Sequence, residues 1–318
     1  MTTDGVAVRL EVLTLGEAMV SIRSKATMRL GGEAHLSVAG SESNVAIGLA
    51  RLGHRAAWIG AVGNDEPGRL IQRTLRAEGV DTRYLRFSDE SFTGFIAFDQ
   101  PAHDITRVSY HRRGSAGSTL TADECIRAME TSQPHLLHVT GITPALSPET
   151  RLASLAAVRA ATAAGVQVSL DVNYRARLWS RADAAAALRE LIPHIHTVFA
   201  SDDELDILTD ATDPIADLLT SAAEVVVTAG SKGAWSHTTS GTTHRPALPV
   251  TVVDSIGAGD AFVAGYLSAT LDHLPIPARL ERATATGAFC VGAYGDWESL
   301  PTREDLTLLA HTHGTALR

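Results

Sequence analysis

Short apolar runs alternate with longer segments, in which apolar residues recur every three or four positions, along most of this chain. The runs at residues 136–139, 166–172 and 197–200 predict strands, and the segments 148–164 and 182–191 between them predict helices. Strands that alternate with helices favour a mostly parallel sheet with helices on both faces. The pattern therefore predicts an α/β fold in three layers, with a mostly parallel central sheet flanked by helices.

The same alternation extends toward both ends of the chain. Further strands are expected at residues 10–19, 35–38, 56–62 and 224–228, and a hairpin at 234–237 and 242–246. Further helices are expected at residues 45–52, 65–78, 202–208, 261–271 and 278–294.

Residues 84–113 break this alternation. Strand-like pieces at 84–87, 93–98 and 107–112 follow one another without a helical repeat between them, which indicates a small β appendage inserted in the α/β chain. We expect one domain over residues 1–318, with the appendage formed mainly by residues 84–113 together with short N-terminal strands.

Composition narrows the classes of function. A net charge of −9 without a basic run makes nucleic acid a poor candidate partner. Two cysteines, Cys125 and Cys290, suggest no disulfide framework and fit a reducing cytoplasm. No apolar run approaches the roughly 20 residues that span a bilayer, and the first ten residues lack the apolar core of a signal peptide. We expect a cytoplasmic protein that has no membrane partner.

The first candidate chemistry lies in a glycine turn, DSIGAGDAF, at residues 254–262. Valines at 250, 252 and 253 predict a strand before the turn, and the residues after it have helical spacing. Gly257 and Gly259 let the backbone approach a ligand, and the first amides of a helix form an anion site. Asp260 is placed there to take a proton from a hydroxyl while phosphate charge is stabilised beside it. A turn of this composition also occurs where a helix merely packs on a sheet.

A second motif, more than 200 residues earlier, favours the functional interpretation of the glycine turn over the purely structural one. The sequence AGSESNVA at residues 39–46, followed by LG at 52–53, together with the glycine turn resembles the two signatures of the ribokinase-like carbohydrate kinases of the phosphofructokinase-B type. Two departures, Ala39 for glycine and Ser255 for threonine, each replace one small residue by another. The resemblance extends over roughly residues 10–305.

The resemblance implies that ATP phosphorylates a sugar hydroxyl. Asp260 would be the general base, the backbone at Gly257, Ala258 and Gly259 would hold the developing charge, and Gly40, Ser41 and Asn44 would bind the sugar. The chain has no GxxxxGK[S/T] P-loop. The phosphates must therefore be held by other means, which favours the start of the helix at Asp260.

Three segments resemble the nucleotide site of this family. TAGSKG at residues 228–233 resembles its nucleotide loop, although its composition alone also fits a hairpin turn. The pattern of Ser201 and Glu204 fits a helix capping box, which is a sufficient structural reason for both residues. In the family, however, asparagine and glutamate stand at these two positions and touch phosphate and magnesium through water. DVNYR at residues 171–175 ends a strand at the ligand-binding edge of the sheet, although its arginine also fits a solvated loop. The expected nucleotide-site residues are Asn173, Arg175, Ser201, Glu204, Thr228, Gly230, Lys232, Gly233, Gly257 and Gly259.

The segment YHRRGSA at residues 110–116 is the most informative for substrate, because an arginine binds a carboxylate through two parallel hydrogen bonds. It resembles the 2-keto-3-deoxygluconate kinases, in which the matching tyrosine and arginine contact the sugar acid, and this implies Tyr110 and Arg112. The same resemblance implies that Asp296 binds a substrate hydroxyl and that Arg175 bridges substrate and phosphate. Ile96 stands where that subfamily often has tyrosine, so related sugar acids stay open, and a solvent-facing role for Arg112 stays open as well.

The most specific interpretation is a kinase that converts 2-keto-3-deoxygluconate to its 6-phosphate. Its alternatives are a neutral-sugar kinase, such as a fructokinase or ribokinase, and a non-catalytic sugar or nucleotide sensor on the same fold. The resemblance implies ATP and Mg²⁺, with Glu204 reaching the metal through water, and allows a monovalent cation such as K⁺ near Asp254. It also implies that the β appendage covers the sugar as a lid and joins subunits of a homo-oligomer.

Overall fold

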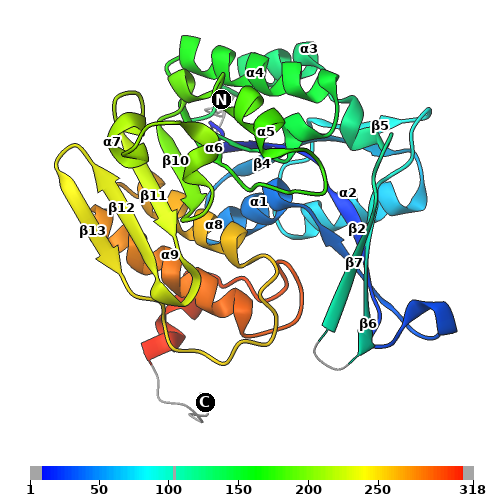
Figure 1. The fold of residues 1–318 in the computed structure, drawn as a ribbon. Helices are drawn as coiled ribbons and strands as arrows, with labels where there is room; N and C mark the ends of the chain where they lie inside the picture. Colours follow the sequence, from blue (N-terminus) through cyan, green and yellow to red (C-terminus); the bar gives the residue numbers. More distant parts are fainter. Residues whose placement is uncertain (1–8, 103–104, 311–318) are drawn as a thin grey trace, which may run out of the picture.

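The structure is a computed structural model that describes residues 9–102 and 105–310. The remaining residues of the expected domain, 1–8, 103–104 and 311–318, lie outside the described part. The described strands form a large sheet and a small sheet, with helices packed on the large one (Figure 1). The predicted class, an α/β fold with a mostly parallel central sheet and a small β lid, is confirmed.

The large sheet has seven parallel strands and ends in an antiparallel hairpin. From the hairpin edge its order is β13 (Gly241–Arg245), β12 (Ala234–Thr238), β11 (Glu224–Thr228), β10 (Thr197–Ser201), β9 (Gln167–Asp171), β8 (Leu136–Thr140), β1 (Val12–Leu15), β4 (Ala56–Gly63) and β5 (Leu85–Ser88). The central strands are buried on both faces, as expected for parallel strands between two helical layers.

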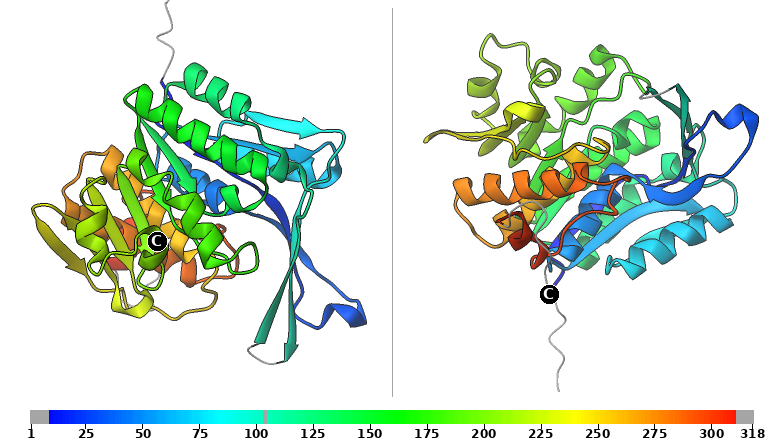
Figure 2. Two further views of the ribbon diagram at one scale, coloured as in Figure 1. Left: turned by 45° about the horizontal axis from the view of Figure 1, so that its top comes forward. Right: turned by 90° about the horizontal axis from the view of Figure 1, so that it is seen from below.

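The helices divide between the two faces of this sheet (Figure 2). One face is packed by α1 (Ser41–Arg51), α2 (Glu66–Ala77), α8 (Ala258–Leu271) and α9 (Ile276–Val291). The other is packed by α3 (Ala122–Ser132), α4 (Pro148–Ala163), α5 (Arg181–Leu188), α6 (Leu205–Leu208) and α7 (Pro214–Leu218). Helix α8 is apolar on nearly every side, because it lies between the sheet, α1 and α9.

The small sheet extends from one side of the molecule (Figure 1, right). Its order is β3 (His35–Ala39), β2 (Met19–Arg23), β6 (Phe95–Ala102) and β7 (Ile105–His111). Only β2 and β6 are parallel. Met19, Ala39, Ile96 and Phe98 bury one face of the small sheet in a separate apolar cluster.

Two predicted strands have a different place in the structure. The strand expected at residues 10–19 divides into β1 in the large sheet and β2 in the small one, because the chain crosses between the sheets at Gly16, where a Cβ would lie 2.1 Å from Glu42. The piece expected at 84–87, as part of the appendage, is β5 and pairs with β4 at the edge of the large sheet.

The predicted elements differ from the structure in three further segments. The valines at 250, 252 and 253 form no strand, and Val252 and Val253 are exposed, because Pro246 and Pro249 interrupt the segment and no neighbouring strand pairs with it. Helices α3 and α7 were missed, although Thr121 and Glu124 form a complete capping box at the start of α3.

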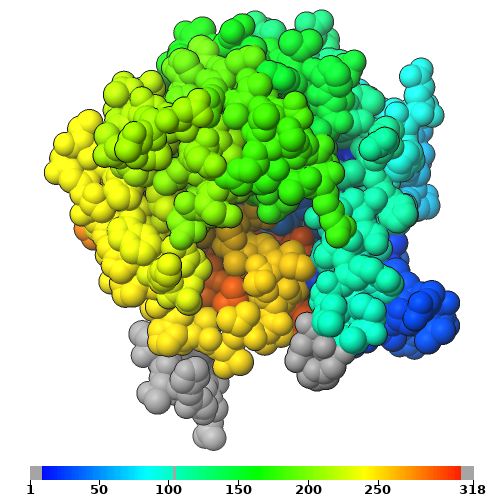
Figure 3. All heavy atoms as spheres, in the orientation of Figure 1, coloured from blue at the N-terminus to red at the C-terminus, as the bar shows by residue number. Residues whose placement is uncertain are grey.

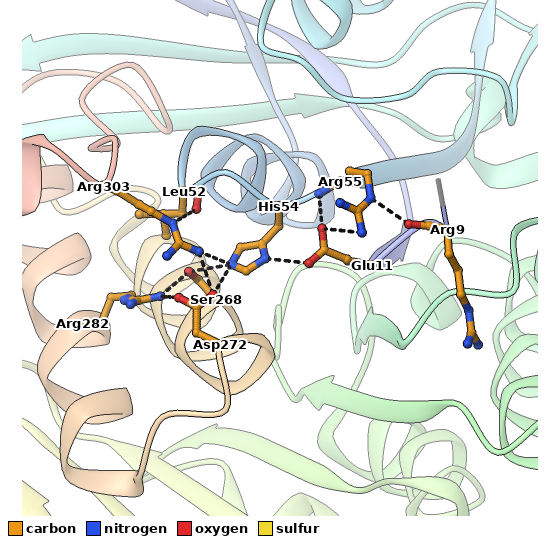
Figure 4. A network of polar contacts seen from close by, with 9 residues as sticks. All are labelled: Arg9, Glu11, Leu52, His54, Arg55, Ser268, Asp272, Arg282 and Arg303. Carbon is orange, nitrogen blue, oxygen red and sulfur yellow. Dashed lines mark hydrogen bonds and ion pairs between the residues drawn. The ribbon is translucent and has the colours of Figure 1, made fainter. Parts of the chain in front are cut away.

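A polar network joins the far ends of α1 and α8 (Figure 4). The buried ring of His54, just after α1, contacts Ser268 of α8 through Nε2 at 2.9 Å and Glu11 through Nδ1 at 3.3 Å. Asp272, at the end of α8, accepts hydrogen bonds from arginines 282 and 303. The network holds the two helices side by side, so that their first turns face each other at the opposite end. Among the described helices, none combines the length and the apolar character that crossing a bilayer requires.

The contact between α8 and α9 yields a stability prediction. A Cβ at Gly265 of α8 would lie 2.2 Å from Thr286 Oγ1 and 2.9 Å from the backbone of Ala283, both in α9. We expect Gly265→Ala to lower the free energy of unfolding by about 1–3 kcal/mol, as overpacking does, measured by urea denaturation. The matched control is Gly287→Ala in α9, where the nearest atom would lie 3.7 Å away. It should leave stability unchanged or raise it by up to about 1 kcal/mol, and equal losses in both variants would contradict the packing argument.

Candidate active site

A cavity of about 500 Å³ lies at the carboxyl edge of the large sheet, beside the small sheet. Figure 3 shows the molecule hollowed here, between the small sheet on the right and the chain around residue 250. The cavity brings together the following predicted site residues: Gly40, Ser41, Asn44, Tyr110, Arg112, Asn173, Arg175, Ser201, Glu204, Thr228, Gly257, Gly259, Asp260 and Asp296. Ala258 lies in the same turn, whereas Gly230, Lys232 and Gly233 do not line the cavity.

The glycine turn is shaped by close packing behind it and open space in front. Gly257 is the N-cap of α8 and has a left-handed backbone with φ 78°. A Cβ there would lie 2.1 Å from the carbonyl oxygen of Asp296, so only glycine fits. At Gly259 a Cβ would meet nothing within 4 Å, so the backbone faces the open cavity. The first amides of α8 therefore form an anion site that a ligand can approach.

Asp260 stands at the contact between the first turns of α8 and α1. Its Oδ1 accepts a hydrogen bond from the Ser41 hydroxyl at 2.6 Å, and its Oδ2 accepts one from the Asn44 amide at 2.8 Å. Burial raises the pKa of Asp260, while the bonds from Ser41 and Asn44 lower it. The carboxylate is thus fixed in orientation and more basic than in water, which suits a general base.

The end of β9 adds a second buried carboxylate. Asn173, held at φ 41°, donates through Nδ2 to Ser41 Oγ at 2.9 Å and to Asp171 Oδ2 at 3.0 Å. Burial raises the pKa of Asp171 to about 8, the charges of Glu204 and Asp260 add to this, and Arg175 opposes it. Asp171 is not among the site residues that the motifs predict. Its position as the last residue of a parallel strand, in the DVNYR segment, was the signal that could have found it.

Glu204 connects the ends of two neighbouring strands. Its Oε1 accepts from the Tyr174 amide at 2.7 Å and its Oε2 from the Ser201 amide at 2.9 Å. Only this half of the expected capping box forms, because the Ser201 hydroxyl donates to Asp203 instead and α6 begins only at Leu205. Glu204 is thereby held in the cavity wall, where its charge contributes to the raised pKa of Asp171.

The backbone geometry of the hairpin requires glycine at two positions of the TAGSKG segment. Gly230 and Gly233 have φ of 52° and 94°, and a Cβ at Gly233 would lie 2.1 Å from the Arg245 carbonyl oxygen. Lys232 is exposed in the turn between β11 and β12. Hairpin geometry therefore accounts for the two glycines, and only Thr228 of this set lines the cavity. The assignment of Gly230, Lys232 and Gly233 to the nucleotide stays a prediction.

Arg112 lines the cavity, but its guanidinium already has a carboxylate partner within the protein. It is 8% exposed, its Nε donates to Glu17 Oε2 at 2.7 Å, and its Nη2 forms an ion pair with the same oxygen. Ser115 donates to the other oxygen of Glu17. No motif indicates Glu17, which lies within the single strand expected at residues 10–19 but stands where the chain crosses between the two sheets. Tyr110, next to Arg112 on the cavity wall, is partly exposed.

Asp296 is also paired. Arg23, the last residue of β2, forms an ion pair with Asp296 and donates to Asp254 Oδ2 at 2.9 Å. Burial raises the pKa of Asp296 to about 7, and the positive charge of Arg23 opposes that rise. Arg23 was not among the predicted residues, because no local motif marks it.

A larger cavity, of about 620 Å³, lies at the opposite edge of the sheet and is lined at the amino ends of β8, β9, β10 and β11. None of the predicted site residues lines it. In open α/β sheets ligands bind outside the carboxyl ends of the strands, so the smaller cavity is the candidate active site. Within residues 9–102 and 105–310, no three His, Cys, Asp or Glu side chains are grouped to hold a metal ion by themselves.

Comparison with known proteins agrees with this geometry. The model of the pfkB family of carbohydrate kinases matches residues 9–303. The chain is 37% identical over 310 residues to 2-dehydro-3-deoxygluconokinase of Bacillus subtilis, covering 94% of both chains. It is 31% identical over 310 residues to a fructokinase of Klebsiella pneumoniae, covering 93% of this chain and 98% of that one.

Solved structures of similar fold cover almost the whole chain. A PfkB protein from Polaromonas sp. JS666 has a TM-score of 0.83 at 32% identity, covering 94% of this chain and 99% of its own. A Vibrio cholerae fructokinase with bound fructose, ADP and potassium ion has a TM-score of 0.81 at 27% identity, covering 95% and 99%. A putative ribokinase of E. coli, in complex with ATP and Mg²⁺, shares the fold with a TM-score of 0.86 at 24% identity, covering 95% and 99%.

The raised pKa of Asp171 predicts how stability varies with pH. In the folded protein this carboxyl keeps its proton up to about pH 8, whereas in the unfolded chain it loses the proton near pH 4. Between these values the folded state binds the additional proton, so unfolding becomes easier as pH rises, by at most about 1.4 kcal/mol per pH unit. Asp171→Asn removes this contribution. Its melting temperature relative to the unsubstituted protein should therefore be higher at pH 8 than at pH 5.

Thermal melts of both proteins in matched buffers check this, with Asp202→Asn at an exposed neighbouring position as the control. Parallel pH profiles for the Asp171→Asn variant and the unsubstituted protein would contradict the assigned titration.

Proposed function

This chain belongs to the pfkB family of carbohydrate kinases, and we propose that it transfers the γ-phosphoryl group of ATP to the 6-hydroxyl of 2-keto-3-deoxygluconate. The observation that carries the proposal is the position of Asp260, held by Ser41 and Asn44 beside the open glycine turn of α8. Base and anion site share one turn, which is the arrangement that phosphoryl transfer to an alcohol needs.

In this proposal Asp260 accepts the proton of the sugar hydroxyl as its oxygen bonds to the γ-phosphorus. The bond from that phosphorus to the bridging oxygen breaks, and ADP leaves. The backbone amides at Gly257, Ala258 and Gly259 stabilise the charge on the transferred group. Ser41 and Asn44 keep the carboxylate in its reactive orientation, and Arg175 contributes positive charge from the cavity wall.

The residues of the cavity suit a magnesium ion that arrives with ATP. Burial and the charges of Glu204 and Asp260 raise the pKa of Asp171, and the positive charge of Arg175 opposes them there. Additional positive charge is needed before a triphosphate can enter. Glu204 would hold the ion through water, because both its oxygens already accept backbone amides. The bound metal would supply positive charge that neutralises the phosphates.

The choice of a sugar acid rests on the relative from Bacillus subtilis, whose name denotes this substrate, and on Tyr110 and Arg112 in the cavity wall. A neutral-sugar kinase is the second candidate. It is supported by the 31% identical fructokinase and by the pairing of Arg112 with Glu17, which already gives the guanidinium a carboxylate partner.

Two further proposals concern assembly and location. We propose a homo-oligomer through the small sheet, because Leu30, Leu36 and Ile105 expose apolar side chains on or beside it. The cytoplasmic location expected from the sequence stays a prediction.

The base assignment predicts the effect of one isosteric change. Asp260→Asn should lower kcat for ADP formation by about 10²- to 10⁴-fold, the usual contribution of a general base. ATP binding, measured by calorimetry, should change little. The control is Asp202→Asn, whose exposed carboxylate lies outside the cavity lining. Full activity of the Asp260→Asn variant would overturn the assignment, whereas loss of ATP binding would mean that the carboxylate holds the nucleotide site rather than the proton.

The substrate assignment predicts a selective effect at Arg112. With 2-keto-3-deoxygluconate, Arg112→Gln should raise KM by about tenfold or more, because a hydrogen bond to a charged group contributes about 1.5–3 kcal/mol; with fructose, KM should stay unchanged. Because the single change leaves Glu17 buried and unpaired, the double variant Glu17→Gln with Arg112→Gln is assayed as well. The matched control is Arg113→Gln at the exposed neighbouring position. Equal effects on the acid and the neutral sugar would favour the fructokinase alternative.

A further inference from the structure

The guanidinium of Arg23 lies beside the glycine turn and is a cation that belongs to the protein itself. It donates through Nη1 to Asp254 Oδ2 at 2.9 Å and through Nη2 to Asp296 Oδ1. All three side chains are largely buried, with 16%, 12% and 9% of their surface exposed. A partly buried guanidinium between two carboxylates is held much more firmly than a surface ion pair.

Both carboxylates belong to the support of the turn. Asp254 precedes the turn, and its Oδ1 accepts from the Ile256 amide at 3.1 Å. Asp296 lies behind it, where its carbonyl oxygen leaves no room for a Cβ at Gly257. Arg23 therefore ties together the two segments between which the anion site is formed.

The surroundings of the turn need this positive charge. The charges of Asp254, Asp260, Asp296 and Glu298 all act on the buried thiol of Cys290 and, with burial, raise its pKa. Arg23 is also fixed from its other side, because its guanidinium lies 4.1 Å from the centre of the Phe98 ring, on the strand paired with β2. The cation is thus held in place before any ligand arrives.

These contacts disagree with the monovalent cation that the family resemblance allowed near Asp254. One oxygen of that carboxylate is bonded to Arg23 and the other to a backbone amide, so the residues present do not suit a metal ion there. Resting on the proposed phosphoryl transfer, we propose that Arg23 takes the place of a monovalent cation at Asp254. The guanidinium holds the turn of the anion site, and the reaction needs no K⁺.

The test compares potassium chloride with tetramethylammonium chloride at equal ionic strength. The unsubstituted protein should form ADP at the same rate in both salts, within about twofold. At equal ionic strength the two salts screen charges equally, and no specific K⁺ site distinguishes them. Arg23→Ala opens space between the two carboxylates, so its activity should fall in tetramethylammonium. Potassium should restore that activity by about 5- to 150-fold, the usual range for coupled binding. Potassium should also raise the melting temperature of Arg23→Ala, but not that of the unsubstituted protein.

Arg107→Ala is the matched control, because Arg107 forms an analogous two-pronged pair with Asp99 on the same small sheet, away from the turn. It should show no response to potassium. Adding Asp254→Asn to Arg23→Ala should abolish the response, and Arg23→Lys covers the case in which the alanine variant does not fold, because it should stay active without potassium.

Several outcomes overturn the proposal: strong potassium activation of the unsubstituted protein, or an Arg23→Ala variant that potassium neither activates nor stabilises. If the unsubstituted protein shows no kinase activity on any sugar, the proposed function fails, but the melting temperatures still test the cation site.

Discussion

The contact between the first turns of α1 and α8 is the interaction on which the site depends. Asp260 reaches from α8 to Ser41 and Asn44 of α1, and the His54 network fixes the opposite ends of the same helices. A carboxylate between two packed helix starts is held with little freedom to rotate. This rigidity matters for proton transfer, because the base has to be oriented before the hydroxyl arrives.

The same arrangement makes the cavity electrostatically unbalanced. Asp171, Glu204 and Asp260 lie together, and two nearby arginines, Arg23 and Arg112, are already paired with other carboxylates. Because Asp171 keeps its proton up to about pH 8, the charges of Glu204 and Asp260 are opposed mainly by Arg175, so little positive charge is left for the polyphosphate of the proposed reaction. Helix-start amides and an ion carried by the nucleotide are the two physical means of resolving this conflict. In the proposed function, a catalytic carboxylate and an anion site share one turn, and the counter-ion of the nucleotide would supply the positive charge that the cavity lacks.

Most of the fold could be predicted from the sequence, because the alternating strand and helix periods and the two glycine motifs are local signals. Fourteen predicted site residues line one cavity for the same reason: the carboxyl ends of parallel strands meet at one edge. What local pattern could not supply was pairing over long distances. The sequence around Arg112 does not indicate that it pairs with Glu17, 95 residues earlier, and the sequence around Arg23 does not indicate that it pairs with Asp254. The edge position of β5 and the lack of a strand at residues 250–253 likewise depend on neighbours rather than on composition.

Both of these arginines stand on the small sheet or just after it, and this relates substrate choice to the position of the sheet. Arg23 ties β2 to the glycine turn, while Arg112, after β7, is tied to Glu17 at the crossing between the sheets. In the proposed function, a substrate carboxylate would bind the N–H groups of Arg112 that Glu17 does not use, whereas a neutral sugar would form no such ion pair. Discrimination between the two substrate classes would then depend on a second ion pair of one guanidinium. Because that guanidinium is buried and held by Glu17, the direction in which it faces the cavity depends on the position of the small sheet.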